Sequence, residues 1–354
     1  MTPSIVDLAD LVAGLPSTGQ RVFERIFSFD IVTGNLNLPP AMVPWVRTQF
    51  GGLDRVTSQK IVRITNLVTL ESSVYNPLRA LRPHNFSNKG EKHGGNAGEE
   101  VDQFAVPLDY TPEDLFGRVQ GKHCITAGNI AKCEQYHCVV VFNNPGPMDF
   151  SCSEVADYIE TGWKWAQRAH DFDPLARCCL FLWNCTNRAG ASIRHGHAQV
   201  ILGRGSHYVK VESLRKSALL YEEQYGSNYF DDLFAAHEAL GLGWKTGDVR
   251  TMVYLTALKQ NEVMILSQGL TPSLAENIYR VLSCFRDKLD VKSFNLGIAF
   301  PPFGDRIGWE GFPVISRMVD RGNTDNISSD ISAMEFYGAN VVNSDPWETA
   351  KMLR

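Results

Sequence analysis

Long apolar runs are missing from this chain. No stretch approaches the roughly 18 apolar residues that a membrane-spanning helix needs, so the sequence predicts no membrane span. An excess of basic residues is missing as well: 34 Lys and Arg against 39 Asp and Glu give a formal net charge of −5. This balance argues against a broad surface for nucleic acid or for an anionic membrane. The first residues carry Asp7 and Asp10 instead of a basic segment, and we therefore expect no secretory signal.

Cysteine is present, but not at the density of a disulfide scaffold. Eight cysteines in 354 residues are few for a chain long enough to bury a large hydrophobic core. Without a secretory signal, we expect these thiols to be reduced. Apolar residues make up 44% and charged residues 21%, as in ordinary globular proteins. These features favour a cytoplasmic globular protein.

One order of secondary-structure elements is predicted twice. A first run of two strands, a helix and two strands is predicted at 124–130, 137–142, 154–170, 178–183 and 193–202. Its helix begins with a capping box formed by Ser151 and Glu154. A second run of the same kind is predicted at 252–258, 263–266, 271–285, 294–300 and 312–319, where Thr271 and Pro272 begin the helix.

Two β-β-α-β-β units predict an α+β fold, with duplicated halves in one body, an antiparallel sheet and flanking helices. We divide the chain into an N-terminal extension (1–70, mainly helical), a first half unit (71–245) and a second half unit (246–354). The extension is expected to begin with an amphipathic helix, whose apolar residues are Ile5, Leu8, Leu11 and Val12. The stretch 85–103 is too polar to bury, and is either a lid over a site or a surface insertion.

One segment combines residues that make a poor core face and a good reactive one. His195, His197 and Gln199 alternate with glycine and alanine, so in a strand the two imidazoles and the amide point to one face. Upstream, residues 189–192 form a small-residue turn whose backbone N–H groups can approach an anion. Two other interpretations stay open: histidines bonded to backbone carbonyls at a sheet end, or a zinc site, although no third ligand at characteristic spacing accompanies them.

The wider segment reads Asn184, seven residues, Ser192, two residues, and then His195-x-His197-x-Gln199. It resembles the active-site strand of galactose-1-phosphate uridylyltransferases and their relatives in the histidine-triad superfamily, and Gly190 precedes the serine by two residues as in that family. The resemblance runs from about residue 122 to 354. In it, Asn129 corresponds to a base- and ribose-contacting asparagine.

The resemblance implies a nucleotidyltransferase with ping-pong kinetics. His197 corresponds to the family nucleophile, which attacks the α-phosphorus of a nucleotide donor and forms a nucleotidyl-histidine that a phosphorylated acceptor resolves. Gln199 would donate a hydrogen bond to a phosphoryl oxygen, and His195 would orient the nucleophile. The residues that would bind nucleotide or phosphate are Asn129, Asn184, Gly190, Ser192 and Arg194.

Some positions depart from the family pattern. Arg194 stands where the family has proline, and strand alternation would point it away from His195, so it is either a phosphate ligand placed by a twist or a surface arginine. The Cys-x-x-Cys metal pair of many members falls on His123 and Thr126, and the histidine between falls near Gly146. We therefore expect no metal cofactor. An unorthodox site remains the alternative, drawn from His123, Cys124, Cys133, His137 and Cys138.

The acceptor side of the pattern is reduced to Glu335, since Met334 and Val341 replace polar or aromatic contacts. We therefore expect an acceptor other than galactose-1-phosphate. The partners are expected to be a small nucleotide donor and a phosphorylated acceptor, and the resemblance implies a homodimer. Two other functions stay open: a phosphorylase or hydrolase of nucleotide sugars or dinucleoside polyphosphates that uses His197, and a catalytically dead nucleotide-binding protein.

Overall fold

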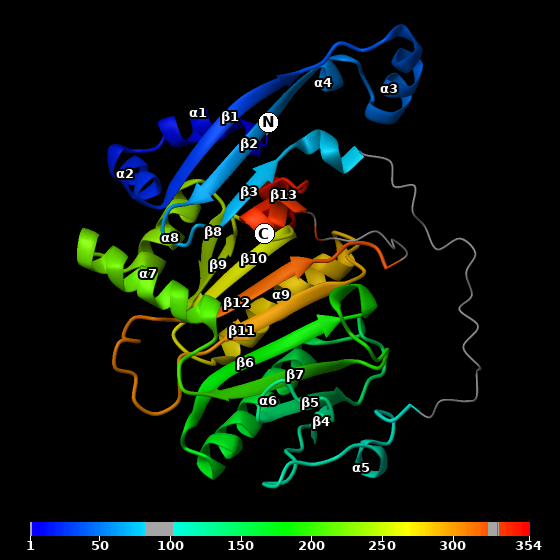
Figure 1. The fold of residues 1–354 in the computed structure, drawn as a ribbon, viewed down its shortest axis with the longest axis vertical. Coiled ribbons are helices and arrows are strands. Elements are labelled where there is room, and N and C mark those ends of the chain that lie inside the picture. The colour runs from blue at the N-terminus through cyan, green and yellow to red at the C-terminus, as the bar shows by residue number, and fades with distance from the viewer. Residues whose placement is uncertain (1, 82–101, 325–330, 332) are drawn as a thin grey trace.

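The computed structural model describes residues 2–81, 102–324, 331 and 333–354, and these form an α+β fold with two sheets (Figure 1). The larger sheet has nine strands in the order β4-β5-β7-β6-β11-β12-β10-β9-β8. These strands are β4 (Cys124–Gly128), β5 (Tyr136–Phe142), β6 (Ala176–Cys185), β7 (His197–Arg204), β8 (Gly243–Thr246), β9 (Val249–Val253), β10 (Gln260–Ser267), β11 (Phe294–Ala299) and β12 (Val314–Asp320). The predicted α+β class is confirmed.

The large sheet is antiparallel at every pairing, and two runs of strands meet at its centre. Toward the centre of the sheet, the first run lies in the order β4-β5-β7-β6, and the second in the order β9-β10-β12-β11, with the short strand β8 outside β9 at the edge. Within each run, the first and second strands in the sequence lie side by side, and the fourth and then the third strand follow toward the centre of the sheet. The runs meet where β6 pairs with β11, as in the pair Asn184 and Asn295.

Two helices cover one face of this sheet. They are α6 (Cys152–Phe172), which begins with the predicted capping box of Ser151 and Glu154, and α9 (Pro272–Asp287), which Thr271 caps. The two helices contact each other as well as the strands below them. A β-carbon on Gly162 of α6 would lie 2.9 Å from the side chain of Val200, so Val200 faces the helix. Because side chains alternate along a strand, His197 and Gln199 face the opposite side of the sheet.

The N-terminal extension contains more strand than the sequence analysis predicted. Its helices include α1 (Leu8–Ala13), α2 (Ser17–Ile26), α3 (Val43–Phe50) and α4 (Asp54–Thr57). The prediction missed β1 (Phe27–Asn35) and β2 (Ser58–Asn66), which pair along their whole length. The four-stranded sheet continues with β3 (Ser72–Tyr75) and with β13 (Ala339–Val342), so it draws strands from beyond residue 70.

The remaining α-helices are short or lie between the two runs of strands. They are α5 (Pro107–Tyr110), α7 (Val209–Tyr225), α8 (Tyr229–Ala239) and α10 (Pro346–Leu353). In the part of the chain that the structure describes, no helix has the length and apolar character to cross a bilayer. All eight cysteines carry free thiols. Of the polar stretch 85–103, only Asp102 and Gln103 lie among the described residues.

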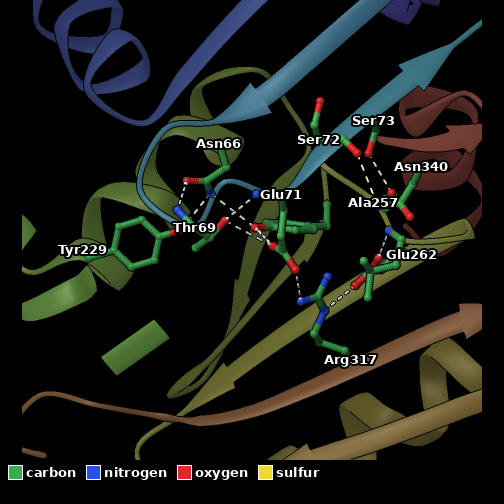
Figure 2. A network of polar contacts seen from close by, with 12 residues as sticks. Asn66, Thr69, Glu71, Ser72, Ser73, Tyr229, Ala257, Glu262, Arg317 and Asn340 are labelled. Carbon is green, nitrogen blue, oxygen red and sulfur yellow. Dashed lines mark hydrogen bonds and ion pairs between the residues drawn. The ribbon is translucent and has the colours of Figure 1, made fainter. Parts of the chain in front are cut away.

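A buried ionic cluster ties the two sheets together (Figure 2). Arg317 on β12 lies 2.6 Å from Glu71, in the connection between β2 and β3, and also pairs with the fully buried Glu262 on β10. The hydroxyl of Tyr254 donates a hydrogen bond of 2.8 Å to Glu71. Burial favours the neutral form of Glu71, but Arg317 outweighs it and lowers the pKa of that carboxyl, whereas burial raises the pKa of Glu262. The cluster therefore links the four-stranded sheet to the large sheet by charge.

Candidate active site

His197 is the first residue of β7 and is 7% exposed. Its Nδ1 lies 2.7 Å from the backbone oxygen of His195, which can only accept, so Nδ1 carries the proton and donates. Burial lowers the pKa of His197 and outweighs the hydrogen bond to the His195 backbone, which raises it. The ring is therefore neutral at neutral pH, and its Nε2 keeps a lone pair. A neutral imidazole held by one nitrogen is suited to attack through the other.

Gly196 explains why a glycine separates the two histidines. A β-carbon at this position would lie 2.9 Å from the ring of Phe142 and 3.0 Å from the backbone oxygen of Asn144. The backbone N–H of Gly196 donates to the oxygen of Pro145 at 3.0 Å. Any larger residue would push the chain away from β5 and displace His197 with it.

His195 lies just before β7, and not within it, because the strand predicted to begin at 193 begins at His197. Its Nε2 is 2.8 Å from the backbone oxygen of Phe142, and its Nδ1 is 2.7 Å from Oδ2 of Asp102. Partial burial opposes ionisation of Asp102, but the hydrogen bond from His195 prevails and lowers the pKa of this carboxyl. The ring of Phe104 meets both histidines edge-on, at 5.9 and 5.3 Å between centroids. These contacts fix the ring of His195, and its backbone oxygen accepts the hydrogen bond from Nδ1 of His197.

The sequence analysis did not predict Asp102 and Phe104 as site residues, because little in the sequence around them indicates such a role. Asp102 lies at the end of the polar stretch 85–103 and Phe104 directly after it, both far from the histidines along the chain. An acidic residue in a polar segment is ordinary, and only the fold brings it to His195.

Gln199 lies two residues beyond His197 on the same face of β7. Its Oε1 is 2.8 Å from Nε2 of His137 on β5. The side-chain nitrogen of Asn129 lies 3.0 Å from the same ring nitrogen. Val139 is the direct cross-strand partner of Gln199, and His137 is two residues before Val139 on the same face of β5.

Two neighbouring pockets surround these residues. The smaller, of about 170 Å³, is lined by His197, Gln199, Asn129 and Val139, and by the segment from Gln103 to Pro112. The larger, of about 810 Å³, is lined by Arg194, Lys292, Asp290 and Asp320 among others. Ser192 and Ile193 line both pockets. Of these two pockets, His197 lines the smaller, which is therefore the candidate reaction site despite its smaller volume.

The turn that carries Gly190 uses most of its own N–H groups. Those of Ala189 and Ala191 donate to the oxygen of Thr186, and that of Gly190 donates to the oxygen of Asn187. Gly190 has φ +100°, a left-handed conformation that glycine adopts without strain. An anion in this region would therefore have to bind to backbone N–H groups after Ala191. We had expected Gly190 itself to contribute to anion binding.

Asn184 braces this turn from behind. Its side-chain oxygen accepts a hydrogen bond of 2.7 Å from Asn295 on β11, whose amide also donates to the oxygen of Ala189 at 2.9 Å. The guanidinium of Arg321 donates to the other end of the Asn295 amide. The sequence analysis missed Asn295 and Arg321, which reach the turn from the second run of strands. Asn184 lines neither pocket.

Arg194 lies in the loop before β7, so strand alternation does not fix its direction. It is exposed, lines the larger pocket, and forms no hydrogen bond or ion pair with any residue that the structure describes. Glu335 lies elsewhere: it is paired with Lys259 at 2.7 Å and lines neither pocket of its own chain. The structure thus gathers Asn129, Ser192, His197 and Gln199, sets Arg194 beside them, and leaves Glu335 apart.

The residues at the family's metal positions do not fit a metal. Thr126 and Gly146 offer no strong ligand, and Cys124 instead contacts the side chain of Asp157 at 3.5 Å. Across the described ranges, no group of three or more histidine, cysteine or acidic side chains is arranged to hold a metal ion. Cys133 lies 3.5 Å from Nδ1 of His137, without further ligands of this kind. We derive no chemical step from a metal.

Comparisons with known proteins bear on the fold. No protein-family model and no curated protein matches the sequence. Among solved structures, an ADP-glucose phosphorylase from Arabidopsis thaliana with bound ADP-glucose matches with a TM-score of 0.62 at 16% identity, over 81% of this chain and 96% of that one. The chain has the fold of galactose-1-phosphate uridylyltransferase-like proteins. A GALT-like protein from the same plant shares this fold at a TM-score of 0.56 and 15% identity, over 72% and 92% of the two chains. A uridylyltransferase matches at 0.55 and 14%, over 82% and 96%.

Proposed function

We propose that this chain is a nucleotidyltransferase that moves a nucleoside monophosphate group from a nucleoside-diphosphate compound to a phosphorylated acceptor through a covalent intermediate on His197. The observation that carries the proposal is the neutral, buried imidazole whose Nδ1 donates to the backbone of His195, while its Nε2 forms no hydrogen bond with any residue that the structure describes. The uridylyltransferase-like fold supports it. A cytoplasmic setting is part of the proposal, supported by eight free thiols.

The proposed reaction has two displacements. Nε2 of His197 attacks the α-phosphorus, the bond from that phosphorus to the bridging oxygen breaks, and the distal phosphate compound leaves with the electron pair. A phosphate oxygen of the acceptor then attacks the phosphorus, and the P–N bond breaks to restore the imidazole. The amide of Gln199 donates to a non-bridging oxygen, where charge develops in each transition state. The His195 carbonyl accepts the Nδ1–H throughout, and so stabilises the ring when it becomes cationic.

The two pockets suit the two parts of such a donor. We place the nucleoside monophosphate part in the smaller pocket, beside His197 and Asn129, and the distal phosphate with its substituent in the larger. Ser192 lines both, and so stands where the bridging oxygen would lie. Arg194 supplies positive charge to the larger pocket, where Lys292 is paired with Asp290.

A phosphorylase is the second candidate function, and the larger pocket supports it as strongly as it supports the transferase. Inorganic phosphate needs a cation more than sugar contacts, and Arg194 provides one, while Glu335 of the same chain lines neither pocket. The homodimer remains a proposal, in which Glu335 of one copy would complete the site of the other.

We also propose that the large sheet arose from two duplicated halves, 71–245 and 246–354, joined to the extension 1–70. The order of strands supports this, because each run places its first, second, fourth and third strands in that sequence toward the centre of the sheet, with β8 as an additional strand at one edge. The second half is then a degenerate unit, since the first and third residues of β12 are Val314 and Ser316, whereas those of β7 are His197 and Gln199.

Exchange kinetics test the proposed function. We expect parallel double-reciprocal plots when donor and acceptor are varied together, because the first product leaves before the acceptor reacts. Donors should be UDP-, ADP-, GDP- and CDP-glucose, with a hexose 1-phosphate, inorganic phosphate or water as acceptor. Transfer to a sugar phosphate supports the transferase, transfer to inorganic phosphate alone supports the phosphorylase, and intersecting plots contradict the covalent intermediate.

The pH dependence of adduct formation should reveal the neutral His197. A lowered pKa means that the imidazole stays unprotonated until the pH falls below the ordinary histidine value, so the rate should hold at pH 6.5 and decline only at lower pH. A nucleotide sugar is the right donor, because its phosphodiesters do not titrate in this range. An apparent pKa at or above 6.5 for the free enzyme would contradict the assignment.

A further inference from the structure

We infer that His137 is a positioning residue for the transfer reaction, because it fixes which end of the Gln199 amide faces the substrate. The inference rests on the proposed function, since it assigns a role to the neighbour of a residue placed at the phosphoryl group. His137 is only 3% exposed and lies on β5, on the face of the sheet that carries Gln199. Neither nitrogen of its ring reaches His197, so its influence passes through Gln199.

The contacts of His137 fix its tautomer. The backbone N–H of Cys133 donates to Nδ1 at 3.2 Å, so Nδ1 is an acceptor and carries no proton. Burial lowers the pKa of His137, which keeps the ring neutral at neutral pH. A neutral ring without a proton on Nδ1 carries it on Nε2. His137 therefore presents an N–H group to the site.

This N–H sets the orientation of Gln199. It donates to Oε1 at 2.8 Å, so the carbonyl end of the amide points to His137 and the NH2 end is available to the pocket. With the opposite tautomer, the ring would accept a bond from the NH2 end, and the carbonyl would face the substrate. A carbonyl oxygen there would repel a phosphoryl oxygen, whereas the NH2 group stabilises it.

Asn129 lies beside the same ring nitrogen but is not hydrogen-bonded to it. Its Oδ1 accepts a hydrogen bond of 2.9 Å from the backbone of Ala131, which turns its NH2 group toward Nε2 of His137 at 3.0 Å. Nε2 carries one hydrogen and therefore cannot accept from this NH2 group. Among the described residues, Oε1 of Gln199 is the acceptor beside it. The NH2 groups of Asn129 and Gln199 thus both remain donors at the wall of the smaller pocket.

A double-mutant cycle tests this role, with the rate of transfer from α-labelled ADP-glucose or UDP-glucose to His197 as the readout. We expect His137→Phe to lower the rate about 10- to 100-fold with little change in donor affinity, since orientation and not the pocket is lost. In a Gln199→Ala protein, the same change should have no further effect. His137→Gln, whose amide can donate to Oε1, should recover part of the rate. His237→Phe is the control, because His237 is equally buried but lies outside the site.

Two results would overturn the inference. One is a cycle in which the losses from His137→Phe and Gln199→Ala multiply, so that His137 acts independently of Gln199. The other comes from the ring itself: ¹⁵N NMR of the protein at pH 7 should show His137 protonated at Nε2 and bare at Nδ1, and the reverse tautomer contradicts the inference. The NMR result does not depend on turnover. A correct tautomer in a chain that labels no donor would count against the proposed function alone.

Discussion

Replacing His197 with glycine should lower the rate of nucleotidyl transfer by about 10⁵-fold or more, because the group that forms the covalent bond is removed. Among the described side chains that line the smaller pocket, no other imidazole, thiol or amine is available to attack in its place. The measurement is single-turnover transfer from a labelled nucleotide sugar. Donor affinity should change little, since the glycine enlarges the pocket without removing charge.

His195→Ala is the matched comparison. Its ring sits behind the nucleophile, held by Asp102 and Phe142, while the contact to His197 is made by its backbone oxygen. The alanine keeps that backbone oxygen but loses the clamp, so slow transfer should persist. Equal losses in both variants would contradict the assignment of His197 as the nucleophile and His195 as the orienting residue.

Replacing Arg317 with alanine should lower the free energy of unfolding by about 3–5 kcal/mol, because Glu262 would be left buried without its cation. The same change frees Glu71, and with it the connection between β2 and β3 that anchors the N-terminal sheet. Urea denaturation should show a lower midpoint with an unchanged slope. Arg317→Ala combined with Glu262→Gln should recover part of the loss, since the second change removes the unpaired charge.

Arg63→Ala provides the contrast. Arg63 pairs with Asp30 across β1 and β2, but both side chains are more than 60% exposed. An exposed pair of this kind contributes at most about 1 kcal/mol. If Arg63→Ala and Arg317→Ala cost the same, the ionic cluster between the two sheets does not hold the extension in place.

The parts of the fold that depend on local sequence could be predicted. The helix α6 begins where Ser151 and Glu154 form their capping box, because those contacts are between residues three apart. Eight of the nine strands of the large sheet were predicted within a few residues of their bounds, and the short edge strand β8 was missed. The strands β1 and β2 were missed, although Phe27, Phe29 and Ile31 alternate with polar residues, because nothing in the extension shows which surface they cover.

The residues of the candidate site also divide into those that the local sequence could identify and those that it could not. His197 and Gln199 could be identified because they lie two residues apart on one strand and match a known pattern. Asp102 reaches His195 over 93 residues, and His137 reaches Gln199 over 62. Such pairs depend on the register of β5 and β7 and on the path of a loop, which no local pattern encodes. The start of β7 was placed too early, because Gly196 is held by contacts to Phe142 and Asn144 that the sequence does not show.

The most direct test of the covalent mechanism is the intact mass of the protein after it is mixed with each nucleotide sugar in the absence of acceptor. We predict a gain of one nucleoside monophosphate per chain with the true donor, on the peptide that carries His195, Gly196 and His197. The mass names the base. The bond should be labile in acid and stable in base, as expected of a phosphoramidate, so the spectrum is taken at neutral or alkaline pH. The adduct should be absent from His197→Gly. A donor that is turned over while His197 stays unmodified would contradict the account, and transfer would then be direct.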